Sequence, residues 1–167
     1  MSAAAASKKT MGRLTVSVEK VADGDQVTLS GEVDDQATLS DLATQLGKKV
    51  VVDLGGVRFI NSVGVREWIV FLGALADRGV KVILRNCSEP MVHQMSMVVE
   101  ARGSAEVESF HAPFLCDDCA SERSLVLAVA PNLDALRARK VPAQKCPDCG
   151  GTMHFDDFPN RYLLFLD

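Results

Sequence analysis

The stretch Val51-Val-Asp-Leu-Gly-Gly-Val-Arg-Phe-Ile-Asn-Ser-Val-Gly64 decides the expected fold of the first two thirds of this 167-residue chain. Residues 50–54 form a continuous apolar run, which is typical of a central strand covered on both faces. Gly55-Gly56 interrupts the run, and Ser62 precedes a helix expected over residues 63–78. Serine is a preferred N-cap, because its oxygen accepts a free backbone N–H, so we expect Ser62 to cap this helix.

The sequence on both sides of this stretch predicts strands that alternate with helices. Residues 14–18 and 27–33 alternate apolar and polar side chains around a turn at 23–25, which indicates a hairpin. The other expected elements, in chain order, are a helix with an apolar face of Leu39, Leu42, Ala43 and Leu46, a strand over 80–84, a helix from Ser88 with Met91, Met95, Val98 and Val99 buried, and a strand over 106–110. The order β-β-α-β-α-β-α-β predicts an α/β fold around a mixed sheet, which we place over residues 11–112.

Composition limits the classes of protein to be considered. The chain has 47% hydrophobic residues and a formal net charge of −4, so it can bury a core and has no overall attraction for nucleic acid or anionic membranes. It lacks an apolar run of roughly 18 to 20 residues, the length a membrane helix needs. Residues 1–10 are rich in Ala and Ser and unlike a secretory signal, so we expect a disordered tail on a cytoplasmic protein.

The C-terminal third, residues 113–167, carries four of the five cysteines in two Cys-x-x-Cys pairs. These are Cys116-Asp-Asp-Cys119 and Cys146-Pro-Asp-Cys149, separated by 26 residues. Two residues between thiolates allow both sulfurs to bind one Zn²⁺ about 2.3 Å away, and four thiolates close a tetrahedral shell. We therefore predict one structural, non-catalytic zinc ion per chain, in a segment too small to fold easily without it. The remaining Cys87 is expected to be a small buried residue.

This segment resembles a zinc ribbon, in which short strands follow the cysteine turns. We expect strands over 125–129, 152–155 and 162–165, and a short helix within 132–140. Zinc ribbons often bind nucleic acids or proteins. Here six Lys and Arg stand against eight Asp and Glu, before the charge of a zinc tetrathiolate is counted, so a protein partner is favoured over a nucleic acid.

The stretch from Val51 to Gly64 also resembles the STAS family, found in sulfate transporters and bacterial anti-sigma factor antagonists. The family motif has an aspartate at the end of an apolar strand, matched by Asp53, followed by Asp-Ser-x-Gly at the start of a helix, matched by Ser62 and Gly64. The predicted element order matches as well. In the antagonist branch, the resemblance implies that Ser62 is phosphorylated by a partner kinase and that the phosphate decides which partner is held.

The chain departs from the family at Asn61, where the motif has aspartate. The lost charge affects recognition by a kinase, so two alternatives stay open: Ser62 is a phosphorylated switch, or it only caps a helix in a scaffold that binds constitutively. In the first case Asn61, Ser62, Gly64, Val65 and Arg66 would form the partner surface. A phosphate at a helix N-terminus is tolerated by the fold, whereas its charge would expel an apolar partner.

The helix after Ser62 is apolar almost all round. Trp68, Leu72 and Leu75 lie on one side with Val65, and residues 69–71 extend the apolar surface. Such a helix is either buried or covered by another body. A partner, a homodimer contact and burial beneath the zinc segment are the alternatives.

The expected function is therefore that of a non-catalytic bacterial regulator acting through protein–protein interaction. We find no nucleophile paired with a base, no glycine-rich phosphate loop and no open metal site, which disfavours an enzyme. The alternative is a scaffold or adaptor subunit of a larger complex, with the zinc ribbon as its docking module.

Overall fold

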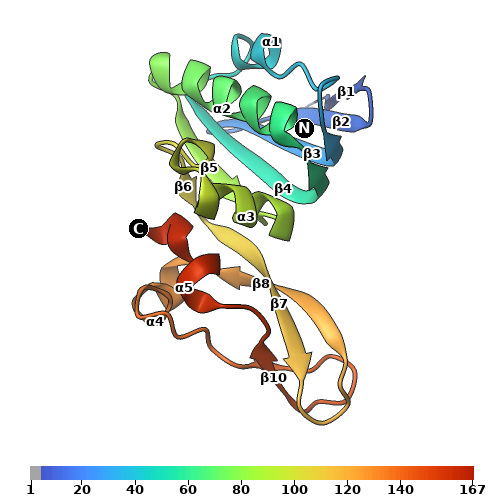
Figure 1. Ribbon diagram of the computed structural model, residues 1–167. Helices are drawn as coiled ribbons and strands as arrows, with labels where there is room; N and C mark the ends of the chain where they lie inside the picture. The colour runs from blue at the N-terminus through green and yellow to red at the C-terminus, as the bar shows by residue number, and fades with distance from the viewer. Residues whose placement is uncertain (1–4) are drawn as a thin grey trace.

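The computed structural model describes residues 5–167, which form two β-sheets joined end to end (Figure 1). The N-terminal sheet has six strands in the order β1-β2-β3-β4-β5-β6, and the C-terminal sheet has four in the order β8-β7-β10-β9. The strands are β1 (Ser7–Met11), β2 (Leu14–Val21), β3 (Gly24–Val33), β4 (Lys49–Ile60), β5 (Lys81–Arg85), β6 (Glu106–Val107), β7 (Ser109–Cys116), β8 (Glu122–Ala128), β9 (Gln144–Lys145) and β10 (Thr152–Phe155). The helices are α1 (Ser40–Ala43), α2 (Ser62–Asp77), α3 (Glu89–Met97), α4 (Leu133–Arg137) and α5 (Pro159–Tyr162), with 3-10 turns η1 (Val99–Ala101), η2 (Ala130–Asn132) and η3 (Leu164–Leu166).

The N-terminal sheet is mixed, as the sequence predicts. Strands β1, β2 and β3 are antiparallel, and β3, β4, β5 and β6 are parallel. The predicted hairpin and the predicted α/β class are confirmed. From β2 onward the strands and helices follow the order β-β-α-β-α-β-α-β, apart from the short η1 turn.

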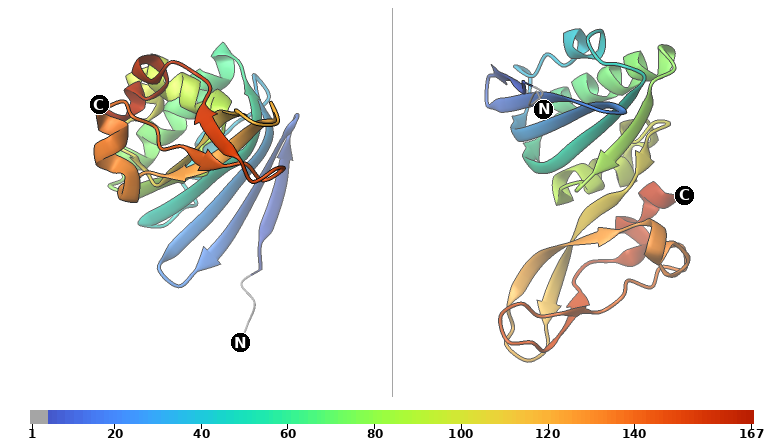
Figure 2. Two further views of the ribbon diagram at one scale, coloured as in Figure 1. Left: turned by 90° about the horizontal axis from the view of Figure 1, so that it is seen from below. Right: turned by 180° about the vertical axis from the view of Figure 1, so that it is seen from behind.

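The helices of this domain cover one face of the sheet only. Alternate strand residues such as Val52 and Leu84 are buried on the helix side, whereas Val51 and Asp53 on the other side are half-buried. Figure 2, seen from below, shows no helix over that second face of β1 to β4. The expectation that both faces of the Val50–Leu54 run are covered is therefore wrong.

The predicted disordered tail needs correction. Residues 7–11 form the edge strand β1, which pairs antiparallel with β2 through a tight turn at Gly12, whose φ is 59°. Met11 is buried at the end of this strand, and the apolar contact explains why a polar stretch is held in the sheet. The part of the predicted tail that spans residues 1–4 lies outside the described residues.

Two helices differ in extent from the prediction. Helix α1 is a single turn over 40–43, although the apolar pattern extends to Leu46, which is buried without being helical. Helix α3 ends at Met97, so Val99 lies on a 3-10 turn and is 76% exposed instead of buried.

The boundary predicted between residues 112 and 113 falls inside a strand. Strand β7 runs without interruption from Ser109 to Cys116, so the change of sheet occurs at Glu108. Cys87 forms a single bridge with Phe110 of β7 and is fully buried, as predicted, and this burial raises the pKa of its thiol.

The C-terminal segment returns to helix α3 and joins the two parts of the chain. Residues 162–165, predicted as a strand, belong to α5 and η3 instead, and Pro159 occupies the start of α5, where its missing N–H is harmless. The Tyr162 hydroxyl donates to the His111 carbonyl at 2.6 Å, and Ser96 of α3 donates to the Tyr162 carbonyl at 2.7 Å. The rings of Phe110, Phe114, Phe155, Tyr162 and Phe165 make a chain of tilted or edge-on contacts.

Candidate metal centre and the start of helix α2

The four predicted cysteines lie together at the far end of the β7–β10 sheet. Their sulfur atoms all lie within 4.8 Å of one another, with Sγ–Sγ distances of 3.6 Å between Cys116 and Cys149 and 3.7 Å between Cys119 and Cys146. Four sulfurs around a tetrahedral ion at about 2.3 Å would be separated by about 3.8 Å. The cluster therefore has the dimensions of a four-thiolate metal site.

The two Cys-x-x-Cys turns have nearly the same backbone geometry. In each turn the N–H of the residue after the second cysteine donates to the carbonyl of the first: Ala120 N–H donates to the Cys116 carbonyl, and Gly150 N–H to the Cys146 carbonyl. The residue after the second cysteine has a positive φ in both, 57° at Ala120 and 76° at Gly150. Glycine, which adopts a positive φ without strain, occupies this position in only one of the two turns.

Gly151 has a different reason to be a glycine. Its φ is not in the left-handed region, but a Cβ at this position would lie 2.0 Å from Oδ2 of Asp118. The second turn therefore passes close to the exposed Asp118 side chain of the first, which would have to move to admit a side chain at position 151.

Hydrogen bonds shift the pKa values of the thiols in both directions. The N–H of Cys149 and the N–H of Asp148 lower the pKa of the Cys146 thiol to about 7, against the effect of burial. The N–H of Gly151 points at the Cys149 sulfur at 3.4 Å. This N–H lowers the pKa of the Cys149 thiol, but the sulfurs of Cys119 and Cys116 outweigh it and raise this pKa to about 12, and the pKa of Cys119 is raised as well. Because thiolates, not thiols, bind metals, this donor set fits a soft or borderline cation such as Zn²⁺.

Charged groups around the cluster are paired with one another. Asp117 lies 2.8 Å from Nε2 of His154, and Asp148 accepts from Ser121 and lies 2.7 Å from Arg123. His154 thus contacts a carboxylate beside the cluster, and the carbonyl of His111 binds Tyr162, so neither histidine belongs to the group of four sulfurs.

The start of α2 differs in one respect from the prediction. Asn61, not Ser62, is the N-cap: its side-chain oxygen accepts the Gly64 N–H at 2.8 Å, and its carbonyl accepts the Val65 N–H. Ser62 is the first helical residue and is exposed. Asparagine and aspartate both cap helices well, which explains how Asn61 can stand where the motif has an acid.

The other residues predicted for the partner surface divide into two groups. Gly64 is buried, and a Cβ there would lie 1.9 Å from the Val33 carbonyl, so its role is the close packing of α2 on β3 and not surface contact. Val65 is half-buried against the core, whereas Arg66 is exposed.

Two exposed apolar residues close to Ser62 in the sequence were not predicted. Val63 is 45% exposed and Phe59 is 48% exposed. An irregular register between β3 and β4 near Gly31 and Glu32 shifts the end of β4, which the sequence pattern alone does not reveal.

The apolar surface of α2 is largely buried within its own domain. Trp68, Phe71, Leu72 and Leu75 are buried, and Trp68 Nε1 donates to the Ala101 carbonyl at 2.7 Å. The C-terminal segment packs on α3 instead (Figure 1). Burial of α2 beneath the predicted zinc segment, one of the three alternatives, is therefore not what the structure shows. Val63 and Val70 stay exposed.

Comparison with known proteins does not identify the chain: no family model matches it, and no curated protein is significantly similar. Among the described residues, no helix has the length and apolar character that crossing a membrane requires.

Proposed function

We propose that this protein is a non-catalytic cytoplasmic regulator of the STAS type, in which the start of α2 binds a protein partner and phosphorylation of Ser62 releases it. The C-terminal segment is a zinc ribbon whose ion is structural. The proposal rests on the geometry of Ser62 together with the STAS-like motif and strand order.

The observation that carries the proposal is an exposed serine at the first position of a 16-residue helix. Within the described residues, the N–H groups of Ser62 and Val63 have no hydrogen-bond partner, because Asn61 caps those of Gly64 and Val65. A phosphate on Ser62 would meet two free donors and the positive end of the helix dipole. Its charge would also lie next to the exposed Val63, where an apolar partner would be repelled.

The test compares Ser62→Asp with Ser62→Ala. Partners captured by the wild-type protein are expected to remain bound to Ser62→Ala and to be lost from Ser62→Asp. Ser104→Asp, which adds the same charge at an exposed serine outside this surface, is the control for a general charge effect. Equal capture by Ser62→Asp and wild type, or intact protein from native cells without added phosphate, contradicts the switch.

A second candidate function, a constitutive scaffold, is favoured by apolar surface on the other domain. Leu115 of β7 and Val126 of β8 are 37% and 48% exposed and lie on the outer face of the β7–β10 sheet. This face suits a docking module. A Val126→Lys change that removes a partner, while Ser62→Asp leaves the same partner bound, would support the scaffold over the switch.

A further inference from the structure

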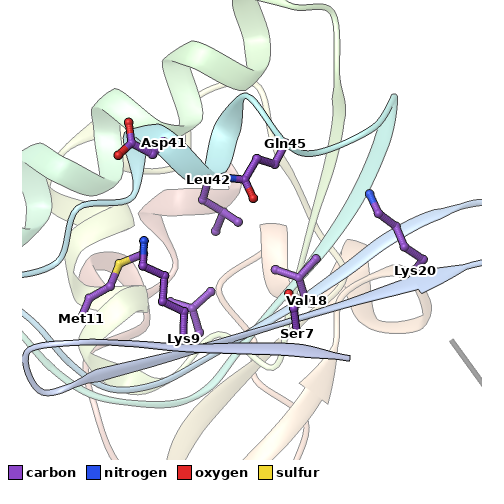
Figure 3. A pocket seen from close by; sticks show the side chains of 9 residues that line it. Ser7, Lys9, Met11, Val18, Lys20, Asp41, Leu42 and Gln45 are labelled. Carbon is purple, nitrogen blue, oxygen red and sulfur yellow. The ribbon is translucent and has the colours of Figure 1, made fainter. Parts of the chain in front are cut away.

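A cavity of about 150 Å³ lies between helix α1 and the hairpin of β1 and β2 (Figure 3). Its apolar wall comes from Met11, Val16, Val18 and Leu42, of which only Val18 is more than marginally exposed. Figure 3 shows Met11 and Val18 on the sheet below and Leu42 on α1 above.

The length of α1 explains why the cavity exists. One helical turn, over residues 40–43, must cover two strands of five and eight residues at the edge of the sheet. Residues beyond Ala43 leave the helical path, so the space above Val18 is left open by the described residues. Apolar walls without a packing partner lose dispersion contacts, so an apolar ligand that fills the space is favoured.

The rim of the cavity carries a specific arrangement of charge. Lys20 is held by Asp25 at 2.6 Å, whereas the Lys9 ammonium has no carboxylate within 4 Å among the described residues. The Gln45 amide extends toward the cavity from the other side, and Asp41 lies on the rim at the start of α1 (Figure 3). Lys9 and Gln45 carry hydrogen-bond donors on the rim of the cavity.

We propose that this cavity binds a small monocarboxylate with a branched or compact apolar body of about four to six carbons, a size set by comparison with an engineered 150 Å³ cavity that holds benzene. The carboxylate lies at Lys9 and Gln45, and the apolar body contacts Val16, Val18 and Leu42. Asp41 disfavours a second negative charge at the rim. The site shares no residue with the Ser62 surface and does not depend on the proposed switch.

The experiment is an NMR titration of the ¹⁵N-labelled full-length chain with 4-methylpentanoate. Saturable shifts are expected for amides of β1, β2 and α1. The amine of the same shape, 4-methylpentylamine, is expected to give none, and the dicarboxylate glutarate is expected to bind more weakly. Absence of saturable shifts with 4-methylpentanoate, or equal shifts with the amine, overturns the proposal.

Two exposed lysines on one strand supply matched variants. Lys9→Gln is expected to weaken 4-methylpentanoate binding about tenfold, because a charge-assisted hydrogen bond is lost. Lys8→Gln changes the neighbouring residue, whose side chain lies on the opposite face of β1, and is expected to leave binding unchanged. Equal binding by wild type and Lys9→Gln would overturn the assignment of the anion site. Val18→Phe, which fills the cavity, should abolish binding without affecting either lysine.

Discussion

The N-terminal sheet buries Trp68, Phe71 and Leu75 beneath α2, whereas the far end of the β7–β10 sheet buries little besides Met153 and two cysteine side chains. Between these extremes, the near end of the second sheet packs its aromatic residues against α3. The two regions therefore hold their strands in different ways. The first relies on apolar area, and the second relies on apolar contact at one end and, in our proposal, on a metal ion held by four sulfurs at the other.

Loss of one metal ligand is the largest perturbation we expect. In Cys146→Ser the chain should lose its ion, and with it a contribution on the order of 10–16 kcal/mol, so the far end of the second sheet should unfold. Hydrogen exchange should become fast over 116–122 and 145–153 while amides of α2 stay protected. Zinc analysis should fall from one ion per chain to less than one.

Cys87→Ala is the control for this change, because Cys87 is buried in the N-terminal core and is not one of the four sulfurs. It should keep its full zinc content. Retention of zinc by Cys146→Ser, or loss of α2 protection together with the ribbon, would show that the two regions are not stabilised separately.

The contact between the regions should be sensitive to Tyr162. Truncation to alanine removes a buried ring that lies 5.4 Å from those of both His93 and Phe155, and is expected to cost about 3–5 kcal/mol. Tyr162→Phe removes only the hydroxyl that binds the His111 carbonyl and should cost about 1 kcal/mol. Urea unfolding measures both, and zinc content should be unchanged in each. Equal costs for the two variants would mean that the ring does not join the regions.

An acid titration should affect the N-terminal region through Asp25. This carboxylate is 2% exposed; burial alone would raise its pKa, but Lys20 and the N–H of Gly47 outweigh burial and lower it. A lowered folded-state pKa means that the stabilisation is present above about pH 3.9, the unfolded value, and is lost as pH falls through the folded value. Asp25→Asn should therefore be less stable than wild type at pH 7, by about 1–3 kcal/mol, and the difference should shrink below pH 3.9. Urea unfolding at pH 7 and pH 3 checks this, and a difference independent of pH would contradict it.

Removal of the cap of α2 should have a smaller effect. Asn61→Ala leaves the Gly64 N–H without its partner and is expected to cost about 1 kcal/mol, whereas Asn61→Asp should keep the cap. Ser62→Ala, one residue further along, should change thermal stability by less than about 0.5 kcal/mol, because Ser62 is exposed and not the cap. A larger loss in Ser62→Ala than in Asn61→Ala would restore the capping role that the sequence predicted for Ser62.

The comparison also separates what the sequence could and could not predict. Periodicity located α2, the hairpin and the parallel strands, because apolar spacing reflects burial on a regular element. The four cysteines were predicted as one cluster, because Cys-x-x-Cys spacing is a local constraint that any fold must satisfy. The cap, the buried position of Gly64 and the exposure of Phe59 depend on how β3 and β4 pair, which is a tertiary property.

The errors at the two ends of the chain have related causes. Residues 7–11 are polar and were predicted as a tail, but a neighbouring strand edge supplies their hydrogen bonds. Residues 162–165 were predicted as a strand from their apolar character, although Pro159 favours a helix start and the aromatic pocket beside α3 accepts a helical turn. The local sequence pattern cannot decide the secondary structure of such short segments, because the residues they pack against or pair with lie far away in sequence.

The smallest effect concerns the two cysteine turns themselves. Ala120 and Gly150 occupy equivalent left-handed positions, at φ values of 57° and 76°. A residue with a Cβ is strained by about 1–2 kcal/mol in this conformation, and glycine is not. Glycine loses more conformational entropy on folding, which offsets part of this difference, so Ala120→Gly should stabilise the metal-bound protein by somewhat less than about 1 kcal/mol. Gly150→Ala should destabilise it by a similar amount, because the φ of 76° strains a residue that has a Cβ. Crowding should add nothing to this cost, since the nearest atom to an added Cβ, on Lys145, is 3.7 Å away. Thermal unfolding of the two variants with zinc bound checks both signs, and equal stability of both with wild type would mean that the ion, and not the backbone of the turns, sets their conformation.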